Sequence, residues 1–129
     1  MITRDQFLEI LCKYPELIDQ GYKCHGRDVD LYGLKADMLL VDKYKKRLAV
    51  HVRTAPIEQE QIGAIVSCQE AVLSDEAGDI NVMLVSDKVP VHLQTALEHS
   101  GVAWREINHF QIKELLTKKN DTELLKTIL

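Results

Sequence analysis

The sequence predicts an α/β domain with a mixed sheet flanked by helices. Apolar runs at 35–41 and 48–53 are separated by a basic turn, a pattern typical of an antiparallel hairpin. Apolar runs at 80–85 and 102–107 enclose a helical pattern that begins at Pro90 and ends at Gly101. Strands joined by a helix are normally parallel neighbours with a right-handed crossover, so the sheet is expected to combine antiparallel and parallel pairs.

The composition of the 129 residues suits one globular domain, because 46% are hydrophobic and 28% are charged. No apolar run approaches the roughly 18 residues that span a membrane, and the first residues lack the apolar segment of a signal peptide. We therefore expect a cytoplasmic protein without a membrane partner. Cys12, Cys24 and Cys68 include no C-x-x-C pair, so three free thiols are predicted rather than a zinc site or a disulfide framework.

The N-terminal region is expected to form a helix, a short helical turn and an extended segment. Thr3 and Gln6 have the spacing of a capping box, and apolar residues at helical spacing follow to about Lys13. Pro15 and Gly21 are typical of the start and the end of a second, short helical segment. Residues 22–31 are weakly extended and complete an antiparallel meander with the two hairpin strands.

Helical patterns also fill the middle and the end of the chain. Pro56 is expected to open a helix that runs to about Leu73, with apolar residues near period 3.6. Residues 109–129 carry one or two amphipathic helices, whose leucines either contact a second copy in a homodimer or cap the domain's own core: Leu115, Leu116, Leu124 and Leu125. The expected organisation is a domain over residues 1–107 and a helical extension over 108–129 that packs on the domain or on a dimer partner.

Three ionisable residues interrupt the apolar hairpin: Asp37 on its first strand, and His51 and Arg53 on its second. Burying a charged group is costly unless the charge is paired. One explanation is an ion pair between Asp37 and Arg53, with His51 as a hydrogen-bonded core histidine. Both partners must then point to one face of the sheet, so the numbers of paired hairpin residues must have an even sum.

Four segments of the chain have the order and spacing of a known superfamily. They are 14–18 (YPELI), 35–42 (KADMLLVD), 61–63 (QIG) and 82–107. Together with the order of the expected elements, they resemble the PD-(D/E)XK, or restriction-endonuclease-like, superfamily, and in particular the endonuclease-like domain of NucS-type DNA endonucleases and their uncharacterised relatives. The resemblance covers roughly residues 7–107.

The resemblance implies a Mg²⁺ site, in which an Asp on the second strand and a Glu two residues before a Lys on the third hold metal ions that activate a water. Asp37 falls on the motif Asp, His51 on the Glu and Arg53 on the Lys. A neutral imidazole is a poor ligand for Mg²⁺, and a guanidinium keeps its proton at any working pH. The motif is therefore degenerate. We expect no cofactor, and Mg²⁺ or Mn²⁺ only if activity persists.

The helix after the motif contributes further candidate residues. The resemblance implies a site role for Gln61, although Ile65 stands where family members often have an aromatic residue. Some members of the superfamily carry the missing carboxylate on this helix. Glu58 and Glu60 are therefore candidate metal ligands together with Asp37.

The densest basic segment is the turn of the hairpin, which we call the basic turn: Lys43, Lys45, Lys46 and Arg47. The formal net charge of −4 argues against broad, nonspecific adhesion to nucleic acid, because such binding needs an excess of Lys and Arg. A local patch can still bind phosphates. The basic turn and Arg53 are thus candidate nucleic-acid contacts, and the alternative is an ordinary solvated turn.

Three functions are compatible with these features. The first is a nuclease-fold module with a degenerate metal site that binds nucleic acid, such as DNA, or another partner without catalysis. The second is a divalent-metal-dependent DNA endonuclease that uses Asp37 with Glu58 or Glu60, and Arg53 as a phosphate clamp. The third is a structural or regulatory subunit without nucleic-acid contact, which the acidic pI of about 5.7 favours mildly. The degenerate motif favours the first.

Overall fold

The computed structural model describes residues 2–31, 34–73 and 80–128. Its centre is a five-stranded sheet in the order β1-β2-β3-β4-β5. The first three strands form an antiparallel meander, and the last two run parallel to β3: β1 (Lys23–Leu31), β2 (Leu34–Val41), β3 (Arg47–Arg53), β4 (Ile80–Ser86) and β5 (Ala103–Glu106). The mixed sheet expected from the sequence is confirmed.

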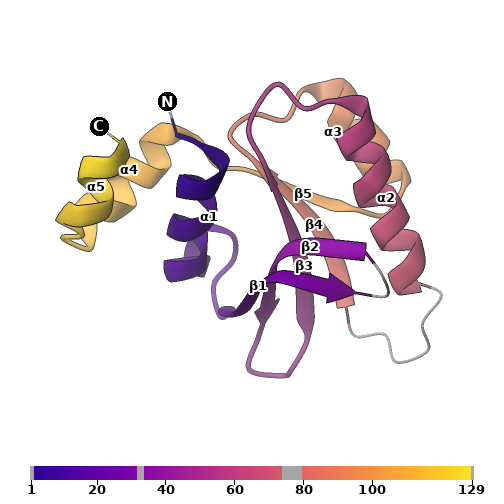
Figure 1. Ribbon diagram of the computed structural model, residues 1–129, viewed down its shortest axis with the longest axis horizontal. Helices are drawn as coiled ribbons and strands as arrows, with labels where there is room; N and C mark the ends of the chain where they lie inside the picture. The colour runs from indigo at the N-terminus through magenta and orange to yellow at the C-terminus, as the bar shows by residue number, and fades with distance from the viewer. Residues whose placement is uncertain (1, 32–33, 74–79, 129) are drawn as a thin grey trace.

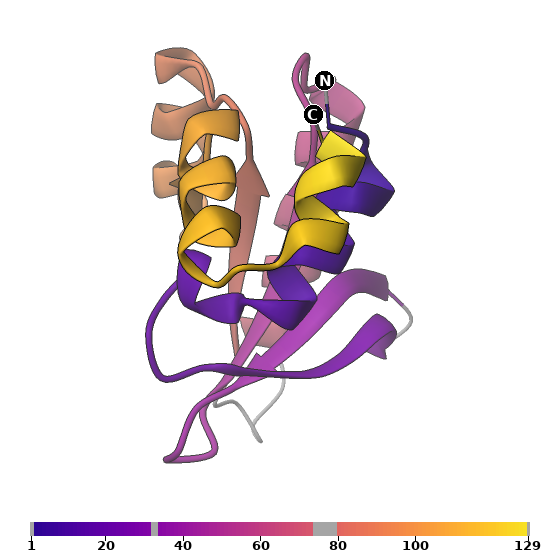
Figure 2. The same cartoon turned by 90° about the vertical axis from the view of Figure 1, so that its left-hand side faces the viewer.

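Helices cover both faces of this sheet (Figure 1). One layer contains α2 (Gln59–Leu73) and α3 (Val91–His99), and the other contains α1 (Arg4–Lys13), α4 (His109–Lys118) and α5 (Thr122–Ile128). A single 3₁₀ turn, η1 (Pro15–Leu17), follows α1. Figure 2 shows the second layer from outside, with α5 beside α1 and both ends of the chain at the same end of the layer. None of the helices within the described ranges is long and apolar enough to cross a membrane.

Apolar side chains from the sheet pack against both helical layers, so the central strands are buried on both faces. The cluster under α1, α4 and α5 includes Phe7, Met38, Val50, Val85, Ile112, Leu116 and Leu124. The cluster under α2 and α3 includes Ala49, Ile65, Val82, Leu84 and Leu97. A polar side chain between the two ends of β3 is therefore shut off from water.

The helix starts follow local hydrogen bonds. Thr3 and Gln6 form the expected capping box of α1. The expected start of α2 at Pro56 is wrong, because the helix begins at Gln59. The Gln61 side-chain oxygen accepts a hydrogen bond of 2.8 Å from the Glu58 N–H, which satisfies one of the free donors that precede the helix.

The C-terminal helices are anchored to α1 by apolar and polar contacts. Leu116 and Leu124 are buried in the chain's own core, and Leu125 packs against it. Asp121, at the start of α5, accepts hydrogen bonds of 2.6 Å each from the Lys13 ammonium and the Tyr14 hydroxyl. These bonds lower the pKa of Asp121 to about 2. Three of the four C-terminal leucines, Leu116, Leu124 and Leu125, therefore pack within the chain's own core.

The cysteines differ from the three free thiols expected. Cys12, near the end of α1, forms a disulfide with Cys24 of β1, with 5.3 Å between their Cα atoms. Cys68 is a buried free thiol, and burial raises its pKa. The prediction of three free thiols is wrong because cysteine spacing carries no information on how α1 packs against the edge of the sheet.

Candidate functional site

Asp37 lies on β2 beside the end of the β2–β3 pairing. The paired residues run from Met38 with Val50 to Val41 with Arg47, and their numbers have the even sum required for the ion pair. Beyond the Met38–Val50 pair, the Asp37 side chain takes the place of a strand carbonyl, because its Oδ2 accepts a hydrogen bond of 2.7 Å from the Val52 N–H. Asp37 is 8% exposed. Its carboxylate is thus part of the strand pairing.

Two guanidinium groups complete the environment of this carboxylate. Arg53, at the end of β3, donates to Asp37 Oδ2 at 2.5 Å and to the Val52 carbonyl at 2.8 Å. Arg4, in the first turn of α1, donates from Nη2 to Asp37 Oδ1. We call these three residues the Asp37 cluster. Both carboxylate oxygens accept charge-assisted hydrogen bonds from these guanidinium groups.

The structure thus brings Asp37 and Arg53 together as the sequence suggests, and it adds Arg4. Sequence reasoning missed Arg4, because 33 residues separate it from Asp37 and it stands on a helix with no unusual local pattern. Its only signal is a cation in the first turn of a helix, where the macrodipole favours acidic residues. The position is disfavoured locally, and the contact with Asp37 compensates for it.

His51 lies on β3 between two apolar neighbours and is 2% exposed. The pKa of His51 is lowered from 6.5 to about 4, chiefly because of burial. The charge of Asp37 opposes this shift, and the charge of Arg53 adds to it. Within the part of the chain that the structure describes, the Nε2 atom of His51 has no hydrogen-bond partner. His51 is therefore a neutral core histidine at pH 7.

The residues at the motif positions do not fit a Mg²⁺ ion. Asp37 offers two oxygens that already face guanidinium groups, and His51 offers a neutral nitrogen, whereas Mg²⁺ prefers free carboxylate oxygens. Glu58 and Glu60 are exposed around the start of α2, and the Gln61 side chain bonds to the backbone there. Across residues 2–31, 34–73 and 80–128, no group of three or more His, Cys, Asp or Glu side chains could hold a metal ion.

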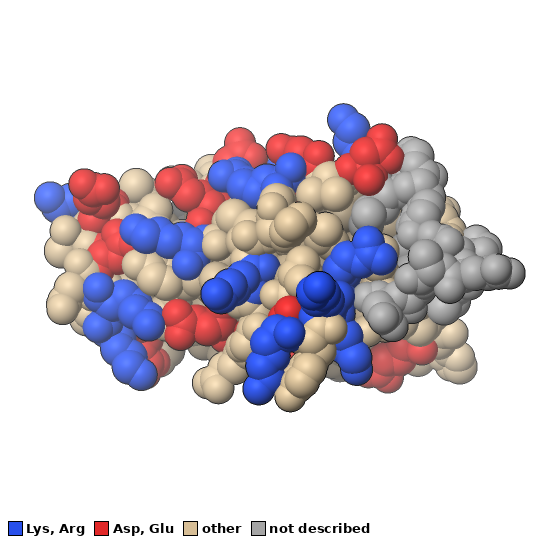
Figure 3. All heavy atoms as spheres, turned by 90° about the horizontal axis from the view of Figure 1, so that it is seen from below, with Lys and Arg blue, Asp and Glu red and all other residues tan. Residues whose placement is uncertain are grey.

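The basic turn projects from the sheet between β2 and β3. Lys43, Lys45 and Lys46 are exposed, and the Lys43 ammonium lies 5.1 Å from the centre of the Tyr44 ring, which is 72% exposed. Asp42 holds the turn, because its Oδ1 accepts hydrogen bonds of 2.9 Å each from the N–H groups of Tyr44 and Lys46. In Figure 3, which views the molecule from below, several Lys and Arg side chains lie close together near the centre, with Asp and Glu side chains around them.

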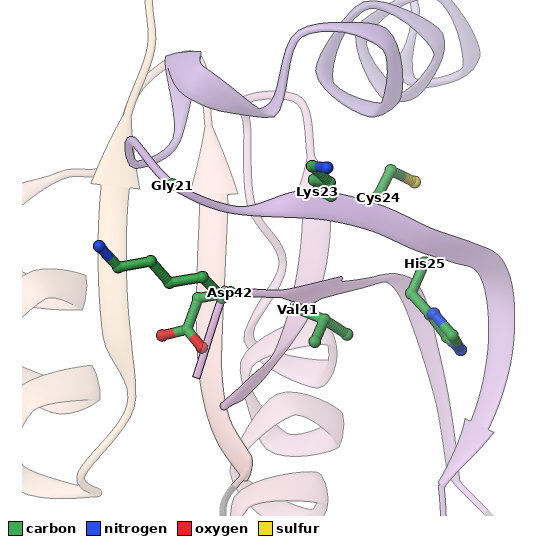
Figure 4. Close-up of a pocket in the computed structure, with 7 residues that line it drawn as sticks. Gly21, Lys23, Cys24, His25, Val41 and Asp42 are labelled. Carbon is green, nitrogen blue, oxygen red and sulfur yellow. The ribbon is translucent and has the colours of Figure 1, made fainter. Parts of the chain in front are cut away.

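A cavity of about 420 Å³ opens beside the basic turn (Figure 4). It lies between the start of β1 and the end of β2, and its lining consists of Gly21, Lys23, Cys24, His25, Val41, Asp42 and Lys43. Two lysines and a histidine thus face one carboxylate. Sequence reasoning missed this cavity, because its two walls come from segments about twenty residues apart that only the β1–β2 register brings together.

Comparisons with known proteins rest on structure alone, because no family model and no curated sequence matches the chain. A repair endonuclease from Pyrococcus abyssi is 14% identical with a TM-score of 0.72, and the match covers 84% of this chain and 48% of that one. EndoMS in a complex with double-stranded DNA is 17% identical with a TM-score of 0.72, over 82% of this chain and 44% of EndoMS.

A third solved structure is more distant. SfsA from Pyrococcus furiosus, in complex with Ca²⁺, is 16% identical with a TM-score of 0.53, over 81% of this chain and 57% of SfsA. The chain therefore spans about half the length of the proteins it matches. The strand order, the mixed pairing and the two helical layers agree with these likenesses. This chain has the restriction-endonuclease-like fold of the NucS and EndoMS repair endonucleases.

Proposed function

We propose that the chain is a DNA-binding module with a nuclease fold, in which an ion-pair cluster has replaced the metal site. The observation that carries the proposal is the engagement of both Asp37 oxygens by Arg4, Arg53 and the Val52 N–H. A carboxylate held in this way is a structural group, because binding a cation would first require separating it from two guanidinium groups. The module is expected to bind DNA without cleaving it.

The exposed basic residues support DNA as the partner. Lys43, Lys45 and Lys46 stand on one turn, and Lys23 and His25 extend the cationic surface along the neighbouring cavity. Lysines that neutralise phosphates release counterions, which supplies much of the affinity of proteins for DNA. The structurally similar EndoMS has been solved with double-stranded DNA. A DNA partner would also place the chain in the cytoplasm, as expected from the sequence.

Changing Lys43, Lys45 and Lys46 together to glutamine should weaken DNA binding and reduce its salt dependence. If each lysine neutralises one phosphate, the slope of log affinity against log salt should fall by about 3, at roughly 0.9 per contact. Fluorescence anisotropy with labelled DNA at several salt concentrations measures both quantities. The matched control changes Lys113, Lys118 and Lys126, which are exposed on the C-terminal helices, to glutamine. Equal slopes in the two variants would contradict this assignment.

The same preparation separates the three candidate functions. Labelled single-stranded, duplex and branched DNA are incubated with the protein in Mg²⁺ or Mn²⁺, with Asp37→Asn in parallel. The proposal expects binding and intact DNA. Cleavage that Asp37→Asn abolishes would instead support the endonuclease that uses Glu58 or Glu60. Absence of both binding and cleavage would support a structural or regulatory subunit.

The homodimer expected from the C-terminal leucines is tested separately. Leu116 and Leu124 are buried in the chain's own core, so burying these leucines does not require a second copy. Phe110 on α4 is 71% exposed and is available to a partner. If a dimer forms through α4, Phe110→Ser should weaken it about tenfold or more, since truncating a buried interface aromatic often costs over 1 kcal/mol. Sedimentation equilibrium measures this change, and a wild-type monomer at micromolar concentration would contradict the dimer.

A further inference from the structure

The Cys12–Cys24 disulfide connects the end of α1 to the start of β1, at the exposed edge of the sheet. Both cysteines are half-buried rather than enclosed in the core. The α1 helix has a second anchor, because four of its apolar side chains are almost completely buried: Phe7, Leu8, Ile10 and Leu11. Breaking the disulfide should therefore release the β1 edge without unfolding the domain.

Cys24 is one of the residues that line the cavity beside the basic turn. Figure 4 shows Lys23, Cys24 and His25 along β1, next to the Val41–Asp42 end of β2. The lining carries two positive charges, on Lys23 and Lys43, and one negative charge, on Asp42. The Oδ1 atom of Asp42 already accepts hydrogen bonds from two backbone N–H groups. The cavity therefore favours an anionic ligand, and its volume of about 420 Å³ is large enough for part of a tripeptide.

We infer that Cys12 and Cys24 form a reversible thiol–disulfide switch, which exchanges with a small anionic thiol of the glutathione class through this cavity. The inference rests in part on the proposed function. In a compartment that contains DNA, thiols are normally kept reduced, and a disulfide there is usually transient or redox-sensing rather than a permanent crosslink. The pair's exposure at a sheet edge fits that role.

The exchange proceeds in two balanced steps. A small-molecule thiolate attacks Cys24 Sγ, so a mixed disulfide forms while the Cys12–Cys24 bond breaks, and Cys12 leaves as a thiolate that takes a proton from water. A second small-molecule thiolate then attacks the non-protein sulfur of the mixed disulfide and releases Cys24. The protein disulfide gains two electrons, and the two small thiols become one oxidised disulfide.

Formation of the disulfide holds one wall of the cavity in place. The oxidised form links β1, with Lys23 and His25, covalently to α1, and the reduced form leaves this edge held by strand pairing and apolar packing, without the covalent link. A preorganised cationic surface binds a phosphate backbone more tightly, because less conformational entropy is lost on binding. The oxidised protein should therefore bind DNA more tightly than the reduced protein.

The switch is tested by equilibrating the protein in mixtures of reduced and oxidised glutathione, followed by alkylation and peptide mass spectrometry. The expected result is a reversible two-electron transition confined to Cys12 and Cys24, with Cys68 remaining a thiol and circular dichroism unchanged. A bond that is reduced only under denaturing conditions, or a pair that stays reduced in oxidised glutathione, would overturn the inference. The Cys24→Ser variant should show no transition.

Access of the thiol through the cavity is tested by the rate of reduction. Reduction by glutathione should be about tenfold slower in the Lys23→Gln/Lys43→Gln double variant, and reduction by the cationic thiol cysteamine should not slow, because the lysines attract the anionic thiol only. Equal slowing with both thiols would exclude this route. DNA affinity of the two redox forms is measured last. A reversible transition without any DNA binding would leave the switch intact and overturn the proposed function alone.

Discussion

Replacing Asp37 with alanine should destabilise the fold by about 3 kcal/mol, the cost typical of breaking a buried ion pair on one side. The variant leaves Arg53 without its partner, and the Arg53 side chain is only 18% exposed. It also removes the acceptor of the Val52 N–H in the middle of the sheet. Arg4 contributes less, because its side chain is 39% exposed and water screens its charge.

Urea unfolding followed by circular dichroism measures this loss. The matched control is Asp5→Ala, which removes an exposed carboxylate that also lies near Arg4, at 3.4 Å, and should change stability by less than about 0.5 kcal/mol. Equal stability of the two variants would show that the Asp37 cluster contributes nothing to the fold.

Asp37→Asn distinguishes a structural carboxylate from a metal ligand. In a metal site, carboxylates repel one another in the absence of the ion, so neutralising one should stabilise the protein. In the Asp37 cluster the neighbours are cations, so the same change should destabilise it. The sign of the shift in melting temperature, measured in EDTA, decides between the two.

Stability should fall by about 3 kcal/mol between pH 6.5 and pH 4 because of His51. The folded pKa of His51 is lowered from 6.5 to about 4, chiefly by burial. Between these values the unfolded chain binds a proton at His51 and the folded chain does not, so acid favours unfolding. The effect is absent above about pH 6.5 and is complete near the folded pKa.

The His51→Gln variant removes this titration and should flatten the pH dependence of the free energy of unfolding. His92→Gln is the matched control, because His92 is exposed on α3. Urea unfolding from pH 7.5 to 4 covers the window, and Asp121, whose pKa is lowered from 3.8 to about 2, contributes equally to the wild type and to His51→Gln, so the difference between the two proteins isolates His51. A pH dependence that is unchanged in His51→Gln would contradict the assignment of His51 as the buried neutral group.

The contrast between Asp37 and Arg4 shows which residues of the Asp37 cluster could be predicted from the sequence. Asp37, His51 and Arg53 were identifiable because they interrupt apolar strands, where charge has a high free-energy cost. The hairpin register then placed Asp37 and Arg53 on one face. Arg4 carries only the weak signal of a cation in the first turn of a helix, which does not indicate a partner on the sheet.

The disulfide, too, depends on contacts that the sequence does not reveal. Sequence patterns placed Cys12 near the end of a helix and Cys24 near the start of a strand, as the structure has them, and still predicted free thiols instead of a disulfide. Whether two thiols meet depends on the packing of α1 against the edge of the sheet. The cavity beside Cys24 has the same origin, because it lies between β1 and the turn that follows β2.

The sequence by itself determined most of the elements, the mixed sheet and the positions of Asp37, His51 and Arg53 on the hairpin, because hydrophobic periodicity and turn residues act over a few positions along the chain. Tertiary structure decided what surrounds these three residues. It placed Arg4 of α1 on Asp37, sealed His51 between two helical layers and joined Cys12 to Cys24. These contacts depend on the distance between elements that are remote in sequence, and no local pattern encodes that distance.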